Sequence, residues 1–408
     1  MRRLPLLAVV FDRGSAGAVE VLASARKLCG VVFVCDDAGV ATGLGEVGEV
    51  LDVSGLGAAE RAKALVELGV EGITTFSEYR LAWTAELAAA CGLVFHSPEV
   101  VEGLVDKERQ RARLREAGVQ STRCVAVRVV DEVPGALAEV GLPAVIKPRS
   151  GAGSVDTCRV DTHEQAMERA GRFLAGGGAE FVVEEFLAGD PEAAGPGFGD
   201  YVSVESVSSG GVLRHVCVTG KLPLAEPFRE TGMFQPACLS GELEREVYAL
   251  TEASVRGLGI TDGVTHVEIK LTPDGPRLIE VNGRMGGYVG ALLRRSARFD
   301  LLRAALRAAL GMPLEVPEPS FDGVEFVYFV TPPATEGGQI LAGVRGLDEV
   351  AALEGVWQVK VDAEAGRELH WRAGTEGHLG TVHGAVADHA ALRETVAAVD
   401  AAIVLEYV

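Results

Sequence analysis

The 408-residue sequence lacks the cysteine patterns that a disulfide framework or a zinc site requires. Its seven cysteines are odd in number, are scattered and include no CxxC pair, which predicts a reducing, cytoplasmic environment. No apolar run reaches the length of a membrane span, and the apolar start (MRRLPLLAVVF) stops at Asp12-Arg13, as expected of a buried strand rather than a signal peptide. Basic residues are also in the minority, 38 against 58 acidic ones, and the net charge of −20 predicts neither nucleic acid nor membrane as a partner.

Two familiar nucleotide-binding motifs are missing as well. The first turn holds Gly14 and Gly17 but no complete GxGxxG, so a dinucleotide site there has little support. Lys147 precedes a glycine-rich loop instead of following it, which excludes a Walker A loop. The acidic charge does not exclude a nucleotide, because a few local cations and metal ions can hold one.

The first 100 residues alternate strand-like and helix-like segments, which predicts a doubly wound parallel sheet. The expected strands are Leu4–Phe11, Val31–Cys35, Val50–Val53 and Ile73–Phe76, and the expected helices are Ala16–Leu28, Ala58–Leu68 and Leu81–Ala90. Glu78 follows the fourth strand, where such sheets present ligands, although a carboxylate there would equally suit a helix N-terminus. The length of the chain predicts two or three domains in all.

The stretch GVTHVEIKLTPDGPRLIEVNGRMGG, residues 263–287, predicts a β-hairpin. Two segments that alternate apolar and polar residues flank a TPDG turn. If the hairpin is symmetric about the aspartate of this turn, Glu268 lies opposite Glu280 and His266 opposite Asn282. All four side chains then share one face.

Two facing carboxylates repel each other, so a cation has to compensate them. Magnesium suits such a group of oxygen ligands, because it binds one or two carboxylates together with substrate phosphates. Arg284 follows directly and offers a planar guanidinium to a phosphate or carboxylate. The alternative is a surface hairpin whose carboxylates pair with Lys270 and arginines, but the other motifs of the chain favour the metal site.

A second motif, PAVIKPRSGAGS, combines a buried strand, Lys147 and a glycine-rich loop. Small residues let backbone N–H groups approach phosphate oxygens while the lysine supplies charge; a plain hairpin turn is the alternative. The later segment VVEEFL suits a hinge that hydrogen-bonds an adenine edge through its backbone, with Phe186 and Leu187 packed on the ring.

The remaining segments predict helices at 241–257 and 289–310 and, after the Pro-rich Met312–Pro319, a third region. That region has expected strands at Glu325–Val330, Trp357–Val361 and Ile403–Tyr407 and an expected helix at Ala390–Ala401. It offers no catalytic constellation, so we expect a structural cap.

In chain order, the motifs resemble the ATP-grasp superfamily of carboxylate–amine ligases, and within it most nearly the bacterial L-amino-acid ligases of the bacilysin type. The matching blocks are DKERQRARLREAGV, PAVIKPRSGAGS, VVEEFL, GDYVSVESV, PFRETGMFQP, THVEIKL and LIEVNGRMGG. The resemblance implies an α/β (α+β) ATP-grasp fold: an N-terminal doubly wound parallel-sheet domain (1–100), a two-lobed ATP-binding core (101–315) and a small C-terminal α+β cap domain (316–408). The core would comprise a small lid lobe at about 120–187 and a large lobe at about 188–315.

The resemblance also implies which residues bind ATP and magnesium. The ATP-binding set is Lys107, Lys147, Gly151, Gly153, Ser154, the hinge residues Glu184, Glu185, Phe186 and Leu187, and Lys221. The ribose contact is open between Glu192, Asp200 and Glu205, because Tyr201 stands where the family usually has a Glu. The metal ligands would be Glu268, Glu280 and Asn282, holding two Mg²⁺ ions, with Mn²⁺ as the alternative.

By the same resemblance, Arg284, Lys147 and Glu230 are the expected catalytic residues. The substrate-binding set is Glu78, Arg229, Glu230, Met233, Arg284, Gly286, Gly287 and Tyr288. Met233 stands where related ligases can have a polar residue.

The implied reaction is an ATP-dependent, ADP-forming ligation that activates an amino acid or related carboxylate as an acyl-phosphate and joins it to an amine. The partners are then small molecules, and a homodimer is expected by analogy. The alternatives are a biotin-carboxylase-like or purine-pathway ligase, or a non-catalytic ATP-binding scaffold.

Overall fold

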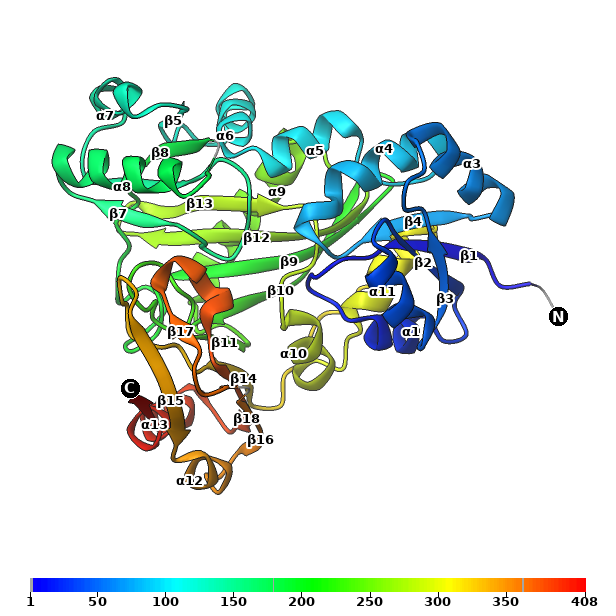
Figure 1. Cartoon of the computed structure of the whole chain (residues 1–408). Coiled ribbons are helices and arrows are strands. Elements are labelled where there is room, and N and C mark those ends of the chain that lie inside the picture. The colour runs from blue at the N-terminus through cyan, green and yellow to red at the C-terminus, as the bar shows by residue number, and fades with distance from the viewer. Residues whose placement is uncertain (1–2, 179, 362) are drawn as a thin grey trace.

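The structure, a computed structural model, describes residues 3–178, 180–361 and 363–408. An N-terminal domain and a lid lobe lie at opposite ends of one long sheet, and the C-terminal strands continue that sheet (Figure 1).

A parallel sheet of the order β3-β2-β1-β4 forms the N-terminal domain, so the predicted parallel arrangement is confirmed. Its strands are β1 (Leu6–Val10), β2 (Gly30–Cys35), β3 (Glu49–Asp52) and β4 (Gly72–Thr75). The helices are α1 (Ala18–Ala25), α2 (Ala38–Gly45), α3 (Ala58–Leu68) and α4 (Leu81–Cys91), with the short 3₁₀ turn η1 (Glu78–Arg80) before α4. Helix α2 was not predicted, because glycines interrupt its helical pattern; the Asp37 side chain caps its first turn.

Helices α5 (Pro98–Val105) and α6 (Lys107–Glu116) lead into a lid lobe with an antiparallel sheet of the order β5-β8-β6-β7. Its strands are β5 (Cys124–Val127), β6 (Ala144–Pro148), β7 (Cys158–Val160) and β8 (Phe181–Glu185). Helices α7 (Val133–Val140) and α8 (His163–Ala175) pack on this sheet, and η2 (Val130–Glu132) precedes α7. The glycine-rich loop connects β6 to β7, as the sequence predicted.

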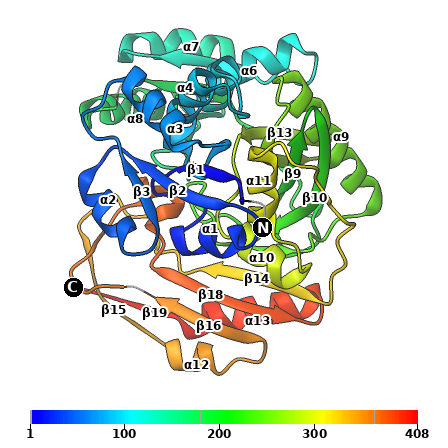
Figure 2. The same ribbon diagram turned by 90° about the vertical axis from the view of Figure 1, so that its right-hand side faces the viewer.

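The central sheet has eight strands in the order β13-β12-β9-β10-β11-β14-β18-β16. Figure 2 shows its strands β14, β18 and β16 one below another in the lower part of the view. Five strands come from the large lobe: β9 (Tyr201–Ser209), β10 (Val212–Lys221), β11 (Gly232–Gln235), β12 (Gly263–Thr272) and β13 (Gly275–Asn282). The other three come from the C-terminal region: β14 (Val324–Phe329), β16 (Val356–Val361) and β18 (Gly380–Val386). The sheet therefore crosses the domain boundary that was expected at residue 316.

Apolar helix faces cover both sides of the large-lobe strands. Helix α9 (Gly241–Gly257) packs on one side with Val247 and Val255. On the other side α10 (Val289–Ser296) and α11 (Leu301–Ala309) join a core that α1 of the N-terminal domain also enters. The expected single helix at 289–310 is in fact these two helices. Asp300 accepts a hydrogen bond from the Arg303 N–H at 3.0 Å and begins the second one.

The remaining C-terminal elements form a three-stranded sheet of the order β17-β15-β19 beside the central one. Its strands are β15 (Gln339–Arg345), β17 (Glu368–Leu369) and β19 (Val404–Tyr407). The other elements of this region are α12 (Leu347–Ala351), α13 (His389–Ala402) and the 3₁₀ segment η3 (Trp371–Gly377). Figure 1 shows the chain after β17 turning up toward the lid lobe.

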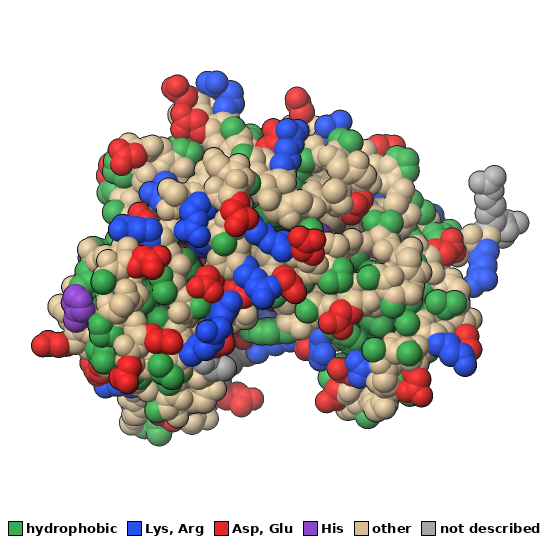
Figure 3. Space-filling model, turned by 90° about the horizontal axis from the view of Figure 1, so that it is seen from above, with side chains coloured by type: hydrophobic (Ala, Val, Ile, Leu, Met, Phe, Trp, Pro, Cys, Tyr) green, Lys and Arg blue, Asp and Glu red, His purple; other side chains and the backbone are tan. Residues whose placement is uncertain are grey.

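Basic and acidic side chains are interspersed over the face shown in Figure 3, which agrees with the abundance of ion pairs. Within the described residues, no helix has both the length and the apolar character needed to cross a bilayer.

Candidate active site

The hairpin β12–β13 brings together the predicted oxygen ligands. Glu268 pairs with Glu280 and His266 with Asn282, so the predicted register is confirmed. The turn itself is tighter than expected, because Thr272 pairs directly with Gly275. A bulge at Ile279 inserts one extra residue and restores the register on the site side.

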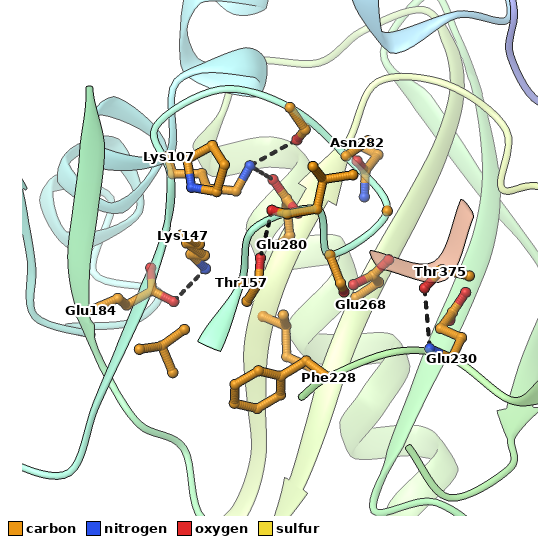
Figure 4. Close-up of a pocket in the computed structure, with 18 of the residues that line it drawn as sticks. Lys107, Lys147, Thr157, Glu184, Phe228, Glu230, Glu268, Glu280, Asn282 and Thr375 are labelled. Carbon is orange, nitrogen blue, oxygen red and sulfur yellow. Dashed lines mark hydrogen bonds and ion pairs between the residues drawn. The ribbon is translucent and has the colours of Figure 1, made fainter. Parts of the chain in front are cut away.

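Each predicted metal ligand has a cationic or imidazole partner in the protein, and Figure 4 shows the one between Glu280 and Lys107. The Lys107 ammonium lies 3.0 Å from Glu280 Oε1 and donates a hydrogen bond to the Gly151 carbonyl at 2.9 Å. The Arg284 guanidinium donates to Asn282 Oδ1 at 3.2 Å. The repulsion expected between the facing carboxylates is thus compensated by surrounding positive charge.

His266, on strand β12 between β13 and β9, bridges two carboxylates. Its Nδ1 lies 2.5 Å from Glu205 Oε1 and its Nε2 lies 3.3 Å from Glu268 Oε1. Burial alone would lower the pKa of His266, but the two carboxylates raise it to about 9. Burial would raise the pKa of Glu268, and His266 together with Lys221 and Arg284 lowers it to about 2. The predicted hairpin had His266 on this face, but no role was predicted for it.

The predicted phosphate-binding lysine on β6 is held by a carboxylate of the neighbouring strand. Lys147 Nζ donates to Glu184 Oε1 at 2.7 Å, and Arg111 donates to both oxygens of Glu184 at 2.8 and 3.0 Å. Burial favours the neutral acid, but the two cations lower the pKa of Glu184 to about 2. The Glu184 side chain is therefore held by these two cations.

A cavity of about 300 Å³ opens between the lid lobe and the hairpin. The sequence-predicted residues that line it are Lys107, Lys147, Gly151, Gly153, Ser154, Glu184, Glu185, Phe186, Leu187, Glu230, Glu268, Glu280, Asn282 and Arg284. One end is apolar, where Phe186 lies 6.4 Å from Phe228 between ring centroids. The other end holds the lysines and the facing carboxylates (Figure 4). A flat apolar base and a charged polyphosphate would match these two ends.

The glycine-rich loop adopts backbone conformations that explain its composition. Gly151 and Gly153 have φ of +131° and +69°, a region that residues with a side chain rarely enter. Ser154 shares the left-handed region with φ of +57°. The loop follows Lys147 directly and forms one wall of the cavity.

A second cavity, of about 480 Å³, adjoins the first. Glu230, Glu268, Arg284 and Thr375 line both, so the two spaces meet at the acid-bearing strands. The predicted substrate residues Glu78, Met233, Gly287 and Tyr288 line the second cavity, together with Lys221, Phe329 and His378. Both volumes are in the range of sites for small organic ligands.

Buried ion pairs fix the polar groups of the second cavity. Arg284 donates to Glu78 Oε2 at 2.9 Å, and burial nevertheless raises the pKa of Glu78. Lys221, which is 1% exposed, donates to Glu230 Oε1 at 2.5 Å. Burial and the charge of Glu230 raise the pKa of the Tyr201 phenol well above its usual value.

Several predicted residues lie outside both cavities. Arg229 donates instead to the carbonyls of Glu226 and Pro332, at 2.8 and 2.7 Å, and so ties its loop to the C-terminal region. Gly286 packs against the His266 ring, where a Cβ would come within 2.5 Å of Nδ1.

The three ribose candidates also separate in the structure. Glu205 is fully buried against His266, and Glu192 is exposed and does not line either cavity. Asp200 lies 2.6 Å from Lys270, which lines the first cavity. Of the three, Asp200 is therefore paired with a residue of the first cavity, whereas Glu205 contacts His266, which lines the second cavity.

The oxygen donors of the hairpin fit magnesium only in part. Among the described residues, no group of three or more His, Cys, Asp or Glu side chains could hold a metal ion alone. Glu268, Glu280 and Asn282 offer two carboxylates and one amide oxygen, all hard ligands, on neighbouring paired positions. Because magnesium usually completes its shell with water and phosphate oxygens, this donor set fits a nucleotide-bound ion.

Sequence reasoning missed the contribution of the C-terminal region. Thr375 and His378 line the cavities although they lie within the region, 316–408, that was expected to be a structural cap. The Tyr288 hydroxyl lies 3.2 Å from His378 Nε2, and the His378 ring stacks on Phe329 with centroids 5.2 Å apart. No local sequence motif identifies Thr375 and His378 as site residues, because their position at the cavities depends on the pairing of β14 with β18.

Comparisons with known proteins give relatives in sequence and in fold. No protein-family profile matches the sequence. The chain is 29% identical over 243 residues to the alanine–anticapsin ligase of Bacillus subtilis, covering 56% of this chain and 51% of that protein. It is 29% identical over 287 residues to human carnosine synthase 1, covering 63% of this chain and 34% of that protein. The chain thus spans about half the length, or less, of these curated relatives.

Two solved structures share the whole fold. The L-amino acid ligase of Bacillus licheniformis superposes with a TM-score of 0.79 at 22% identity and covers 100% of both chains. The N5-carboxyaminoimidazole ribonucleotide synthetase of Thermus thermophilus gives a TM-score of 0.69 at 20% identity, over 97% of this chain and 98% of that one. The chain therefore has the ATP-grasp fold, as its motifs predicted, and is similar in sequence to ligases that act in this fold.

Proposed function

We propose that the protein is an ATP-dependent, ADP-forming ligase that joins an amino acid or related carboxylate to an amine. The observation that carries the proposal is the junction of the two cavities. One cavity offers an apolar end and a cationic end for a nucleotide, and the other offers charged groups for a small polar substrate. They meet at Glu268 and Arg284, where a terminal phosphate and a carboxylate could be brought together.

A carboxylate reacts poorly with an amine, because its leaving group would be an oxide. Transfer of a phosphoryl group from ATP gives an acyl-phosphate, and phosphate then leaves when the amine attacks. The protein's task is to hold two anions in contact by positioning and by charge. Lys107 and Lys147 face the phosphate end of the first cavity, and Arg284 lies where the two cavities join.

We assign Glu230 to the amine. It lines both cavities, and its carboxylate could accept the proton that the ammonium group must lose before the nitrogen attacks. Lys221 holds its carboxylate in place at 2.5 Å. Glu78 and Tyr288 would shape the remaining substrate wall.

Magnesium bound by Glu268, Glu280, Asn282 and phosphate oxygens would supply positive charge at the transferred group; we propose two ions. The glycine-rich loop over the first cavity would keep water from the acyl-phosphate. The proposed substrates are small molecules, and the proposed assembly is a homodimer.

The test is release of ADP and phosphate across a matrix of amino acids and amines, with hydroxylamine added to trap the acyl-phosphate. We expect the rate of ADP release to fall at least about 100-fold in Glu280→Gln and in Arg284→Ala. This is the order of magnitude for the loss of one charge contact in the transition state. Circular dichroism and thermal melting should show an intact fold.

Glu192→Gln provides the matched control, because this residue is exposed and lies outside both cavities. It should turn over at the wild-type rate. Normal turnover by Glu280→Gln or Arg284→Ala would contradict the site, and no ADP release by the wild type with any acid–amine pair would contradict the function.

A further inference from the structure

The 3₁₀ segment η3, Trp371–Gly377, is embedded in the lid lobe although it belongs to the C-terminal region. The Trp371 side chain is 6% exposed and lies in the same apolar core as the lid-lobe strands and helices. The Arg169 guanidinium of α8 sits over its ring at 5.2 Å. Glu336, upstream of the segment, pairs with Arg169 and Arg172 at 2.9 and 3.0 Å. The contact is therefore built from both apolar packing and charge.

The same segment holds the glycine-rich loop through its backbone. The Thr375 N–H donates to the Gly153 carbonyl at 2.8 Å, and the Asp156 N–H donates to the Arg372 carbonyl at 3.0 Å. The Arg372 guanidinium also pairs with the Asp156 carboxylate. Gly374 allows this approach, because a Cβ there would lie 2.2 Å from the Gly153 oxygen.

Thr375 reaches the substrate side with its hydroxyl. Thr375 Oγ1 accepts a hydrogen bond from the Glu230 N–H at 3.1 Å (Figure 4). The Glu230 carbonyl accepts from Thr331 Oγ1 at 3.2 Å, so the backbone of this residue is held on both sides. One residue of the C-terminal region thus contacts both the loop over the nucleotide cavity and the residue assigned to the amine.

From this geometry we infer that Thr375 is a positioning residue, which links closure of the glycine-rich loop to the orientation of Glu230. The inference rests on the proposed function for its kinetic consequence. When the loop is in place, the Gly153 carbonyl fixes the Thr375 backbone, and the Thr375 hydroxyl then fixes the Glu230 backbone. Loss of the loop contact frees the Thr375 backbone and thereby weakens one of the two anchors of the Glu230 backbone, so the amine is best oriented when the nucleotide is enclosed.

The key variant is Thr375→Val, which keeps the β-branched shape and the N–H but removes the hydroxyl. We expect the KM of the amine substrate to rise about five- to tenfold, as for one lost hydrogen bond, with the KM of ATP unchanged. Less amide should form per ADP released, because a misplaced amine leaves the acyl-phosphate to water. Thr375→Ser restores the hydroxyl and should recover both quantities.

A second readout is hydrogen exchange with a non-hydrolysable ATP analogue, which needs no turnover. In the wild type the analogue should slow exchange in the loop 150–157 and in the segment 228–232 together. In Thr375→Val it should slow exchange in the loop alone. Gly374→Ala should weaken the protection of both, because its Cβ displaces the Gly153 carbonyl.

Unchanged amine KM in Thr375→Val, or protection of segment 228–232 that persists in it, would overturn the inference. Failure of Thr375→Ser to rescue would do the same, since it would indicate packing alone. Absence of ligation by the wild type counts against the proposed function only, because the exchange experiment tests the linkage separately.

Discussion

Replacing Glu184 by Gln removes one negative charge from a place where two buried cations meet. Arg111 and Lys147 both donate to this carboxylate, at distances from 2.7 to 3.0 Å, and Glu184 is 4% exposed. Glutamine has nearly the same shape but offers only one acceptor oxygen. Its amide N–H₂ would face a guanidinium or an ammonium, and the two cations would be left without a counter-charge.

The magnitude follows from the perturbed pKa. A pKa lowered from 4.5 to about 2 corresponds to about 3 kcal/mol of preference for the charged form. Removing one partner of a buried ion pair costs about 3 to 5 kcal/mol in general. We therefore expect Glu184→Gln to lower the free energy of unfolding of the lid lobe by about 3 to 4 kcal/mol.

Urea denaturation, followed at the lid lobe by exchange or proteolysis, measures this loss. Glu185→Gln is the matched control: the neighbouring Glu185 lies 3.3 Å from Arg123, whose side chain is about half exposed, so a cost below about 1 kcal/mol is expected. Because the folded pKa of Glu184 is depressed, its stabilisation is complete above about pH 4.5 and is lost as the pH falls toward 2. Equal stability of the two variants at pH 7 would refute this account.

Two further predictions concern histidines. His378→Ala removes the ring that stacks on Phe329 in the second cavity and should raise the substrate KM about tenfold, whereas His383→Ala, outside that cavity, should leave KM unchanged in steady-state assays. The raised pKa of His266 contributes about 3 kcal/mol of stability that is complete below about pH 6.5 and is lost as the pH rises through 9. Melting curves in EDTA should show this alkaline loss in the wild type and a smaller loss in Glu205→Gln, which keeps Glu268; a parallel loss in both would contradict the assignment.

The hairpin could be predicted because its information is local. Alternation of polar and apolar residues and a turn motif are enough to pair Glu268 with Glu280. The prediction assumed symmetry about Asp274, whereas the structure has a tighter turn and a bulge at Ile279. The tighter turn and the bulge cancel at the site, because the bulge adds one residue on β13 and so reverses the one-residue shift that the turn introduces.

The parts that could not be predicted depend on contacts between distant segments. No sequence pattern predicted a role for Arg111, and its burial follows from the packing of α6 against β5 and the hairpin. Thr375 belongs to a segment without a recognisable motif, and only the docking of η3 on the lid lobe brings it to the site. Periodicity identifies a strand, but it does not identify the sheet that the strand joins.

The eight-stranded sheet has a consequence for how such a molecule can change. The acid-bearing hairpin and β11, which begins two residues after Glu230, belong to one hydrogen-bonded ladder, with β9 and β10 between them. The distance from Glu268 and Glu280 to Glu230 therefore depends on the spacing of these strands. Lys147 stands on a different sheet, that of the lid lobe. Substitutions in the loops that border the cavities can accordingly change which substrates bind, while the distance from Glu268 and Glu280 to Glu230 stays constant.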